Sequence, residues 1–320
     1  MKKLLLTLCL SSAWLAAAAQ TSDFPSKPVT FLVPYSTGTG ADLMARLLGP
    51  RLAAMWKVPV ITENKVGASG AIGTEVASKA APNGQTFFIT ATAHGTVPAM
   101  RPKLPFDPHA FVPVVLLGTS ALTLDVSGKS SMQTFQDFVS AVKKSPGEVT
   151  YSSPGTGSPQ HLAMELLSQE AGIKLLHVPY KGTAGALTDL MGGHVQASVV
   201  ALQTAASHVQ GGAMRMLAVM SAERSPAFPN VPTMRELGLP GVVVNTWYGV
   251  LAPAGTPADM VRRVNADINT LLQTKEVQDA MARQGLTVAG GDPQRMGALA
   301  ESELARWARV VKAAGLQSSK

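Results

Sequence analysis

The stretch Tyr35–Gly40 (YSTGTG), which runs into ADLMARLL, decides the fold because a similar stretch occurs again in the second half of the chain. The second copy is Tyr151–Gly157 (YSSPGTG), which runs into SPQHLAMELL. Each copy follows a short β-like run and precedes an apolar pattern of helical period. Each therefore predicts a strand, a glycine turn and a helix N-terminus. A helix N-terminus carries free backbone N–H groups and a partial positive charge, which favour an anion.

Both halves of the chain repeat the order β-α-β-α-β. A second glycine loop begins at Gly67 in the first half and at Gly182 in the second, at similar distances after the first loop. This repetition predicts an α/β protein with two related lobes. The expected strands are 29–33, 58–62, 86–91, 112–117, 148–151, 174–178, 195–200, 216–220 and 242–250. The expected helices are 41–56, 71–80, 159–171, 184–191, 257–272, 276–284 and 293–314.

Two proline-rich passages separate these units. The first, Pro98–Pro113, is expected to be an irregular surface crossover because proline disfavours regular structure. The second, Ser225–Pro232, precedes a strand long enough to return to the first lobe. We assign residues 20–122 and 247–320 to lobe one and 123–246 to lobe two. Two crossings between the lobes would form a hinge.

The N-terminus has the pattern of a secretory signal peptide. Lys2 and Lys3 precede an apolar core, Leu4–Leu15, and the small residues at 17–19 form a cleavage site. We predict a signal peptide over residues 1–19 and export to the periplasm; the alternative is an uncleaved anchor. Cys9 is the sole cysteine and lies in this segment, so the mature chain has no disulfide.

The net charge is positive but modest. The chain has 27 Lys and Arg against 20 Asp and Glu, and loss of Lys2 and Lys3 leaves 25 against 20. A basic chain can indicate a protein that binds nucleic acid. However, the basic residues are scattered, and only 5% of residues are aromatic. Export argues further against nucleic acid as a partner, so the charge is interpreted as a weak attraction for anions.

Motifs of several enzyme classes are missing. The turn at Gly38–Gly40 lacks the third small residue of a dinucleotide fingerprint, since Leu43 stands there. The stretch 67–74 lacks the Gly-Lys-Ser/Thr ending of a phosphate loop, and no Gly-x-Ser-x-Gly elbow occurs. The six histidines show no metal-binding spacing. The sequence therefore predicts neither a cofactor nor a metal.

Alternatives remain at individual positions. The glycine turns could be only tight turns of an α/β fold. Their duplication, with hydroxyl groups around them, favours binding of a carboxylate by backbone N–H and hydroxyl donors. His161 could cap or pack near its helix start, or contact a ligand. Lys181 could be a solvated loop charge or a ligand contact.

The same residues resemble the Bug family, the periplasmic solute receptors of tripartite tricarboxylate transport systems. The matching stretches are 35–46, 64–73, 151–167, 177–182, 231–233 and 247–249. The resemblance implies a two-lobe, Venus-flytrap binding protein in which each lobe is a mixed sheet flanked by helices. It also implies that the loops 35–40, 67–70 and 152–158 line a cleft and hold a ligand carboxylate.

The candidate ligand-binding residues are Tyr35, Ser36, Thr37, Gly38, Thr39, Gly40, Gly67, Ala68, Ser69, Gly70, His94, Ser152, Ser153, Gly155, Thr156, Gly157, Ser158, His161, Lys181 and Ala201. The family's first loop often reads Pro-Gly-Gly where this chain has residues 37–39 (TGT). We also expect the uncharged stretch 198–202 (SVVAL) to form either core strand or an apolar wall of the cleft. Such a wall would disfavour amino acids, whose ammonium needs an acceptor.

The sequence thus predicts a monomeric receptor that captures a small organic carboxylate and delivers it to the membrane subunits of a tripartite transporter, without turnover. One competing class is an exported α/β hydrolase or transferase that uses His161 or Lys181. Another is a basic module that binds polyanions with strong salt dependence.

Overall fold

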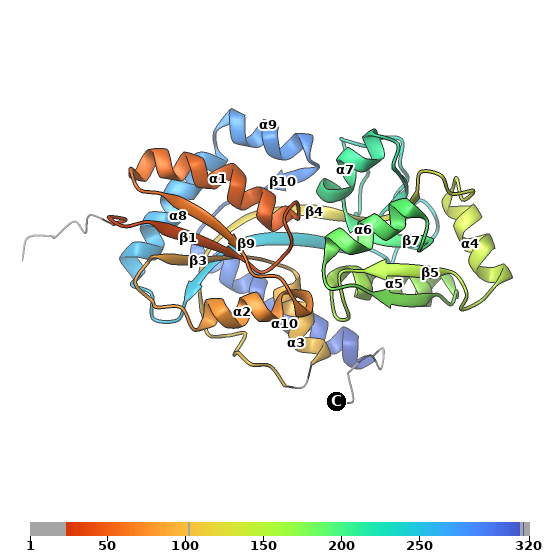
Figure 1. Cartoon of the computed structure of the whole chain (residues 1–320), viewed down its shortest axis with the longest axis horizontal. Helices are drawn as coiled ribbons and strands as arrows, with labels where there is room; N and C mark the ends of the chain where they lie inside the picture. The colour runs from red at the N-terminus through yellow and green to blue at the C-terminus, as the bar shows by residue number, and fades with distance from the viewer. Residues whose placement is uncertain (1–23, 102, 314–315, 317–320) are drawn as a thin grey trace, which may run out of the picture.

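The computed structural model describes residues 24–101, 103–313 and 316. It has two lobes side by side along the long axis of the molecule, with strands β4 (Phe111–Ser127) and β9 (Asn245–Pro253) running between them (Figure 1). The predicted signal peptide, with Cys9, lies outside the described residues. No helix in the described ranges is long and apolar enough to cross a membrane.

Lobe one is built on the order β2-β1-β3-β9-β4, with β10 also paired to β4. β1, β2 and β3 are parallel, whereas β9 is antiparallel to both β3 and β4, so the sheet is mixed. Its strands are β1 (Val29–Val33), β2 (Val60–Asn64), β3 (Thr86–Ala91), β9 (Asn245–Pro253) and β10 (Leu286–Val288). Its helical elements are α1 (Gly40–Trp56), η1 (Ala68–Gly70), α2 (Ala71–Ser78), α3 (Ala93–Met100), α8 (Ala258–Leu272), α9 (Lys275–Arg283) and α10 (Pro293–Ala313).

Helices cover both faces of this sheet. Phe31 packs in a cluster with side chains of α1, α8 and α9, whereas the next residue, Leu32, packs with Ala77 of α2 and Met296 of α10. Successive residues of a strand point to opposite faces, so a strand buried on both sides has a continuous apolar sequence. The apolar run of β1 follows from this position.

Lobe two repeats the arrangement of lobe one. β5 lies parallel between β6 and β7, as β1 lies between β2 and β3. This confirms the two related α/β units predicted from the duplicated loops. Its strands are β5 (Thr150–Ser153), β6 (Leu176–Pro179), β7 (Ala197–Ala201) and β8 (Met214–Val219). Its helices are α4 (Phe135–Lys144), α5 (Pro159–Ala171), α6 (Thr183–Gly192) and α7 (Leu202–Gln210).

The lobes are joined by one long strand and a return segment. β4 (Phe111–Ser127) pairs with β9 up to Ala121 and with β7 and β8 from Leu122 onward. The return passes through Val244, whose N–H donates to Met220 of lobe two, into β9 of lobe one. A hinge between the lobes would therefore lie near residues 121–122 and 244–245.

The C-terminal helix also links the lobes. Trp307 and Val311 at the end of α10 are buried in the lobe-two cluster, as is Met100 at the end of α3. α10 therefore packs against lobe one at its start and against lobe two at its end.

The first proline-rich passage is more regular than predicted. Pro98 lies inside α3, which packs on α10, so tertiary contact outweighs the backbone hydrogen bond that proline removes. Pro113 lies in β4 where the register with β9 shifts between Pro113 and Val115, and such a bulge tolerates proline. The described residues between them, 101 and 103–110, form no helix or strand, as predicted, so the regular parts of the passage are the end of α3 and the start of β4.

Candidate functional site

The first loop, between β1 and α1, is stabilised by hydrogen bonds to the side chain of Asp42. This buried carboxylate accepts hydrogen bonds from the Gly38 N–H at 2.9 Å, Arg46 Nε at 3.0 Å and Asn64 Nδ2 at 3.0 Å. Burial alone would raise the pKa of Asp42, but these donors outweigh it and hold the pKa below its usual value. Asn64 also donates to the Tyr35 carbonyl at 2.9 Å. The loop is therefore fixed before any ligand binds.

The second loop of lobe one carries an unusual backbone. Ala68 and Ser69 have φ values of 51° and 57°, in the left-handed region that is uncommon for residues with a Cβ. Such conformations persist only when the surroundings impose them, and they concentrate at functional sites. Here they place the Ser69 hydroxyl against lobe two, where it donates to the Thr156 carbonyl at 3.2 Å.

The glycine loop of lobe two is supported by a stack of three rings. His177 stacks on His161 at 4.2 Å between ring centroids and on Tyr151 at 4.8 Å. His161 Nδ1 accepts from the Gly157 N–H at 3.4 Å, and His177 Nε2 pairs with the Ser153 hydroxyl at 2.7 Å. Burial lowers the pKa of each histidine to about 4, helped in His177 by repulsion from His161. Both rings therefore support the loop in neutral form.

Glycines allow the loops of the two lobes to approach closely. A Cβ on Gly155 would lie 2.6 Å from Ser69 Oγ, and one on Gly182 would lie 2.7 Å from Ser36 Oγ. Real Cβ atoms essentially never make such contacts. The structure therefore shows the lobes in a closed arrangement that larger side chains at these positions would prevent.

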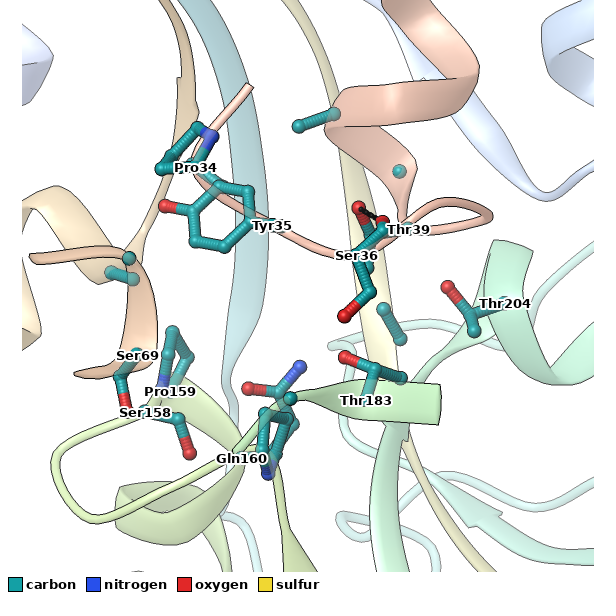
Figure 2. A pocket seen from close by; sticks show the side chains of 18 of the residues that line it. Pro34, Tyr35, Ser36, Thr39, Ser69, Ser158, Pro159, Gln160, Thr183 and Thr204 are labelled. Carbon is teal, nitrogen blue, oxygen red and sulfur yellow. Dashed lines mark hydrogen bonds between the residues drawn. The ribbon is translucent and has the colours of Figure 1, made fainter. Parts of the chain in front are cut away.

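The closed loops surround one small cavity of about 70 Å³ (Figure 2). Figure 2 shows Ser36 and Thr39 of the first loop on one side, with Ser69, Ser158, Thr183 and Thr204 around the same space. A cavity of about 150 Å³ accommodates one benzene molecule. An organic ligand of several heavy atoms must therefore enter while the lobes are apart, or hold them slightly wider.

Six of the described helices begin at this cleft: α1, α2, α3, α5, α6 and α7. Among them, only α5 has its first turn capped by a side chain, Ser158 Oγ accepting from the His161 N–H at 3.2 Å. The first turns of the others keep backbone donors without intrahelical partners. Their partial positive charge converges on the cleft.

The lining holds one charged side chain among the described residues, the exposed Lys181, and no carboxylate. A ligand anion would meet hydroxyl groups, backbone N–H groups and one cation. A ligand ammonium would meet no opposite charge, and an unpaired buried charge is costly.

Ten of the predicted site residues line the cleft: Tyr35, Ser36, Thr39, Gly40, Gly67, Ser69, Gly70, Ser158, Lys181 and Ala201. Others lie behind it as support. Ser152 donates to the Ala186 carbonyl, and Ser153, Gly155, Gly157 and His161 form the hydrogen-bonded base of the loop. Thr156 contributes its carbonyl to the contact with Ser69. Thr37 and Gly38 line a neighbouring cavity, and Ala68 lies beside the cleft within η1.

His94 requires a correction. It is buried at the start of α3, with Nε2 against the Pro108 carbonyl at 3.1 Å and its ring edge-on to Phe111. It does not line the cleft, because the missed helix α3 turns it toward the segment that precedes β4. The apolar wall is also absent: Val199 and Val200 belong to the two lobe-two cores, and Ser198 donates to the Ser152 carbonyl at 3.0 Å. Of that strand only Ala201 reaches the cleft.

Several lining residues were missed by sequence reasoning. Thr246 and Tyr248 come from β9, and Gln203 and Thr204 come from α7, a helix that the sequence analysis did not predict. Its start signal is weak, since Ala201 offers no side-chain cap. Gln160 lies one position beyond the strong Ser158-Pro159 start of α5 and could have been found from it.

Comparison with known proteins identifies the family. A family model described as "Tripartite tricarboxylate transporter family receptor" matches residues 44–316. The chain belongs to this family. This receptor is 34% identical to Protein BugT of Bordetella pertussis over 309 residues, which cover 96% of this chain and 95% of BugT. The resemblance to the Bug family is thereby confirmed.

Solved structures agree with this assignment. The periplasmic binding protein BugD has a TM-score of 0.87 and 30% identity, covering 92% of this chain and 99% of BugD. MatC from Rhodopseudomonas palustris, solved with bound malate, has a TM-score of 0.85 and 31% identity, with 90% and 100% covered. An R. palustris protein solved with adipate has a TM-score of 0.88 and 32% identity, with 91% and 98% covered.

The receptor is thus a solute-binding protein of two-lobe α/β fold and not an enzyme. The geometry agrees: His161 does not line the cleft, its Nδ1 accepts from the Gly157 N–H, and its Nε2 lies 3.9 Å from Glu165 Oε1. A catalytic role for this histidine, kept open by the sequence, has no support in its position.

Proposed function

We propose that this receptor captures a small organic carboxylate between its lobes and delivers it to the membrane subunits of a tripartite transporter. The observation that carries the proposal concerns the described part of the chain: six helix starts, five without a side-chain cap, converge on a cleft whose described lining contains one lysine and no carboxylate. Backbone donors and hydroxyl groups around such a cavity suit a carboxylate.

Closure is part of the proposal. Contacts such as the one from Ser69 to Thr156 exist only when the lobes meet, and the cavity is too small for entry in that state. The lobes are 20–122 with 247–320 and 123–246, and they rotate about the two crossings. A receptor of this kind works as a monomer in the periplasm, after cleavage of residues 1–19. The intact mass of periplasmic protein tests the cleavage.

Ligand capture is tested in two steps. Mass spectrometry of protein purified without added ligand identifies any carboxylate retained in the cleft. A melting-temperature screen of mono- and dicarboxylates follows. A ligand present at about 100 times its dissociation constant adds about 2.7 kcal/mol to the free energy of unfolding, which raises the melting temperature by a few degrees. A broad panel without any shift would contradict the proposal.

Delivery to a transporter needs a separate test. Vesicles containing the membrane subunits should take up the carboxylate only when the loaded receptor is added. Uptake that is independent of the receptor would leave a binding protein without this transport role.

A further inference from the structure

Gln203 is a polar residue of the cleft, and only one of the two polar atoms of its side chain forms a hydrogen bond. It lies in the first turn of α7, lines the cavity, and is 5% exposed. Its Nε2 donates to the Tyr248 hydroxyl, whereas its Oε1 is buried and has no hydrogen-bond partner. A buried amide oxygen is normally paired, so an orphan one beside a binding cavity requires an explanation.

Residues of both lobes surround the amide group of Gln203. Gln203 belongs to lobe two, and Tyr248 is on β9 of lobe one. Gly40, the first residue of α1, leaves room for both: a Cβ there would lie 2.5 Å from Gln203 Nε2 and 2.6 Å from the Tyr248 oxygen. In the structure the amide donates one of its two N–H groups to Tyr248, and its oxygen accepts no hydrogen bond.

The partner of that oxygen must be a donor. Of the cleft side chains, Gln160, Thr183 and Thr204 face the same space, yet none bonds to Oε1. A carboxylate ligand cannot donate through its ionised group, so a ligand that pairs directly with Oε1 must do so through another group. An ammonium is disfavoured because the lining, as far as the structure describes it, holds Lys181 and no carboxylate. A hydroxyl group donates one hydrogen bond without bringing a charge.

We propose that Gln203 determines ligand specificity by accepting a hydrogen bond from a hydroxyl group of the bound carboxylate, so that the receptor selects hydroxy acids over their unsubstituted parents. This inference rests on the proposed function, because it names the ligand class of the same cleft. Closing on a ligand without the hydroxyl leaves the amide oxygen desolvated and unpaired. The expected preference is about ten-fold or more in dissociation constant.

Calorimetry with matched ligands tests this. The probes are succinate against malate, and glutarate against 2-hydroxyglutarate and 2-oxoglutarate. In the wild type, at least one hydroxy acid should bind about ten-fold more tightly than its parent. Gln203→Leu should bring that ratio near one, mainly by weakening the hydroxy acid. Gln273→Leu, an exposed glutamine at the end of α8, is the matched control and should keep the wild-type ratio.

A second variant guards against misfolding of the first. Gln203→Glu keeps the size of the side chain and adds the missing carboxylate, so it should shift the preference from malate toward aspartate. Equal binding of parent and hydroxy acid by the wild type, or an unchanged ratio in Gln203→Leu, would overturn the inference while leaving the receptor function intact. Tighter binding of the 2-oxo acid than of the hydroxy acid would also overturn it, by showing that the amide nitrogen faces the ligand. Failure of every carboxylate to bind would overturn the proposed function itself.

Discussion

The hydroxyl group of Ser69 donates a hydrogen bond to the carbonyl oxygen of Thr156 over 3.2 Å, and this bond joins a loop of lobe one to a loop of lobe two. Ser69 is held in the left-handed backbone region, whereas Thr156 lies in the turn between β5 and α5. We expect this contact to form only when the lobes close and so to contribute to ligand retention.

Ser69→Ala should therefore weaken carboxylate binding. A typical hydrogen bond contributes about 1 kcal/mol, which is about five-fold in the dissociation constant. The loss should appear mostly as faster dissociation, since the bond forms after encounter. Stopped-flow kinetics measure it. Ser78→Ala, which removes a hydroxyl that donates to the Glu75 carbonyl at the end of α2, is the control. Equal effects of the two substitutions would mean that Ser69 acts only locally.

The close approach of the loops of the two lobes should contribute more to carboxylate binding than the charge of Lys181. Gly155→Val would place a side chain against Ser69 Oγ, where even a Cβ lies 2.6 Å away, and would so prevent closure. Lys181→Ala removes an exposed charge and should weaken binding less. Calorimetry of both variants with one bound carboxylate gives the comparison. Gly172 also has a positive φ, 61°, but open space surrounds it. Gly172→Val therefore serves as the control for the effect of backbone strain without a clash. A larger loss in Lys181→Ala would show that an ion pair dominates.

The stacked histidines make the protein sensitive to acid. Their folded-state pKa of about 4 lies below the ordinary 6.5, so the unfolded chain takes up protons that the folded protein excludes. The free energy of unfolding should therefore fall as the pH drops from about 6.5 to 4, by at most about 1.4 kcal/mol per pH unit for each ring. His161→Asn can still accept from Gly157 and cannot titrate.

Urea unfolding between pH 4 and 7 measures this decline. It should be shallower in His161→Asn than in the wild type, whereas the exposed His194→Asn should follow the wild type. Parallel curves for all three proteins would show that the ring stack does not contribute to acid sensitivity.

Asp125 should act in the opposite direction. This carboxyl is buried in β4, has one unpaired oxygen and contacts the Thr123 hydroxyl at 2.5 Å. Burial raises its pKa from 3.8 to about 8. The folded protein then keeps a proton that the unfolded chain loses, so stability falls as the pH rises from about 4 to 8. Asp125→Asn should be more stable than the wild type at pH 8, and this advantage should shrink toward pH 4.

Denaturant unfolding at pH 5, 6.5 and 8 checks this prediction, with the exposed Asp279→Asn for comparison. A constant difference between Asp125→Asn and the wild type across these values would mean that Asp125 does not change its protonation on folding.

The sequence predicted those elements whose local signals and tertiary surroundings agree. α5 begins at Pro159 and ends at Ala171 as predicted, because Ser158 caps it, Pro159 starts it and Gly172 ends it. α4 was missed although Thr134 and Asp137 form a capping box, a signal present in the sequence. α3 was missed because packing on α10 accommodates its proline. β4 was predicted only over 112–117, although a bulge accommodates Pro113 near its start.

The residues of the candidate site were likewise predicted only in part. Loops with hydroxyl and glycine residues were predicted to line a cleft, and many of their residues do. Gln203 and Tyr248 could not be predicted, since their meeting depends on how the two lobes close and no local pattern encodes it. The stretch 198–202 was expected to be either core strand or a wall of the cleft, and Val199 and Val200 are core residues of lobe two.

Small-angle X-ray scattering tests the central claim, capture of a carboxylate by lobe closure, most directly. Two samples of the mature protein are compared, one without ligand and one with a saturating concentration of a carboxylate. Binding of this carboxylate is first established by calorimetry. The account predicts a smaller radius of gyration in the bound state, because the loops around Ser69 and Thr156 must separate to admit the ligand and meet to hold it. An identical radius of gyration in both states, with binding proven, would contradict capture by closure.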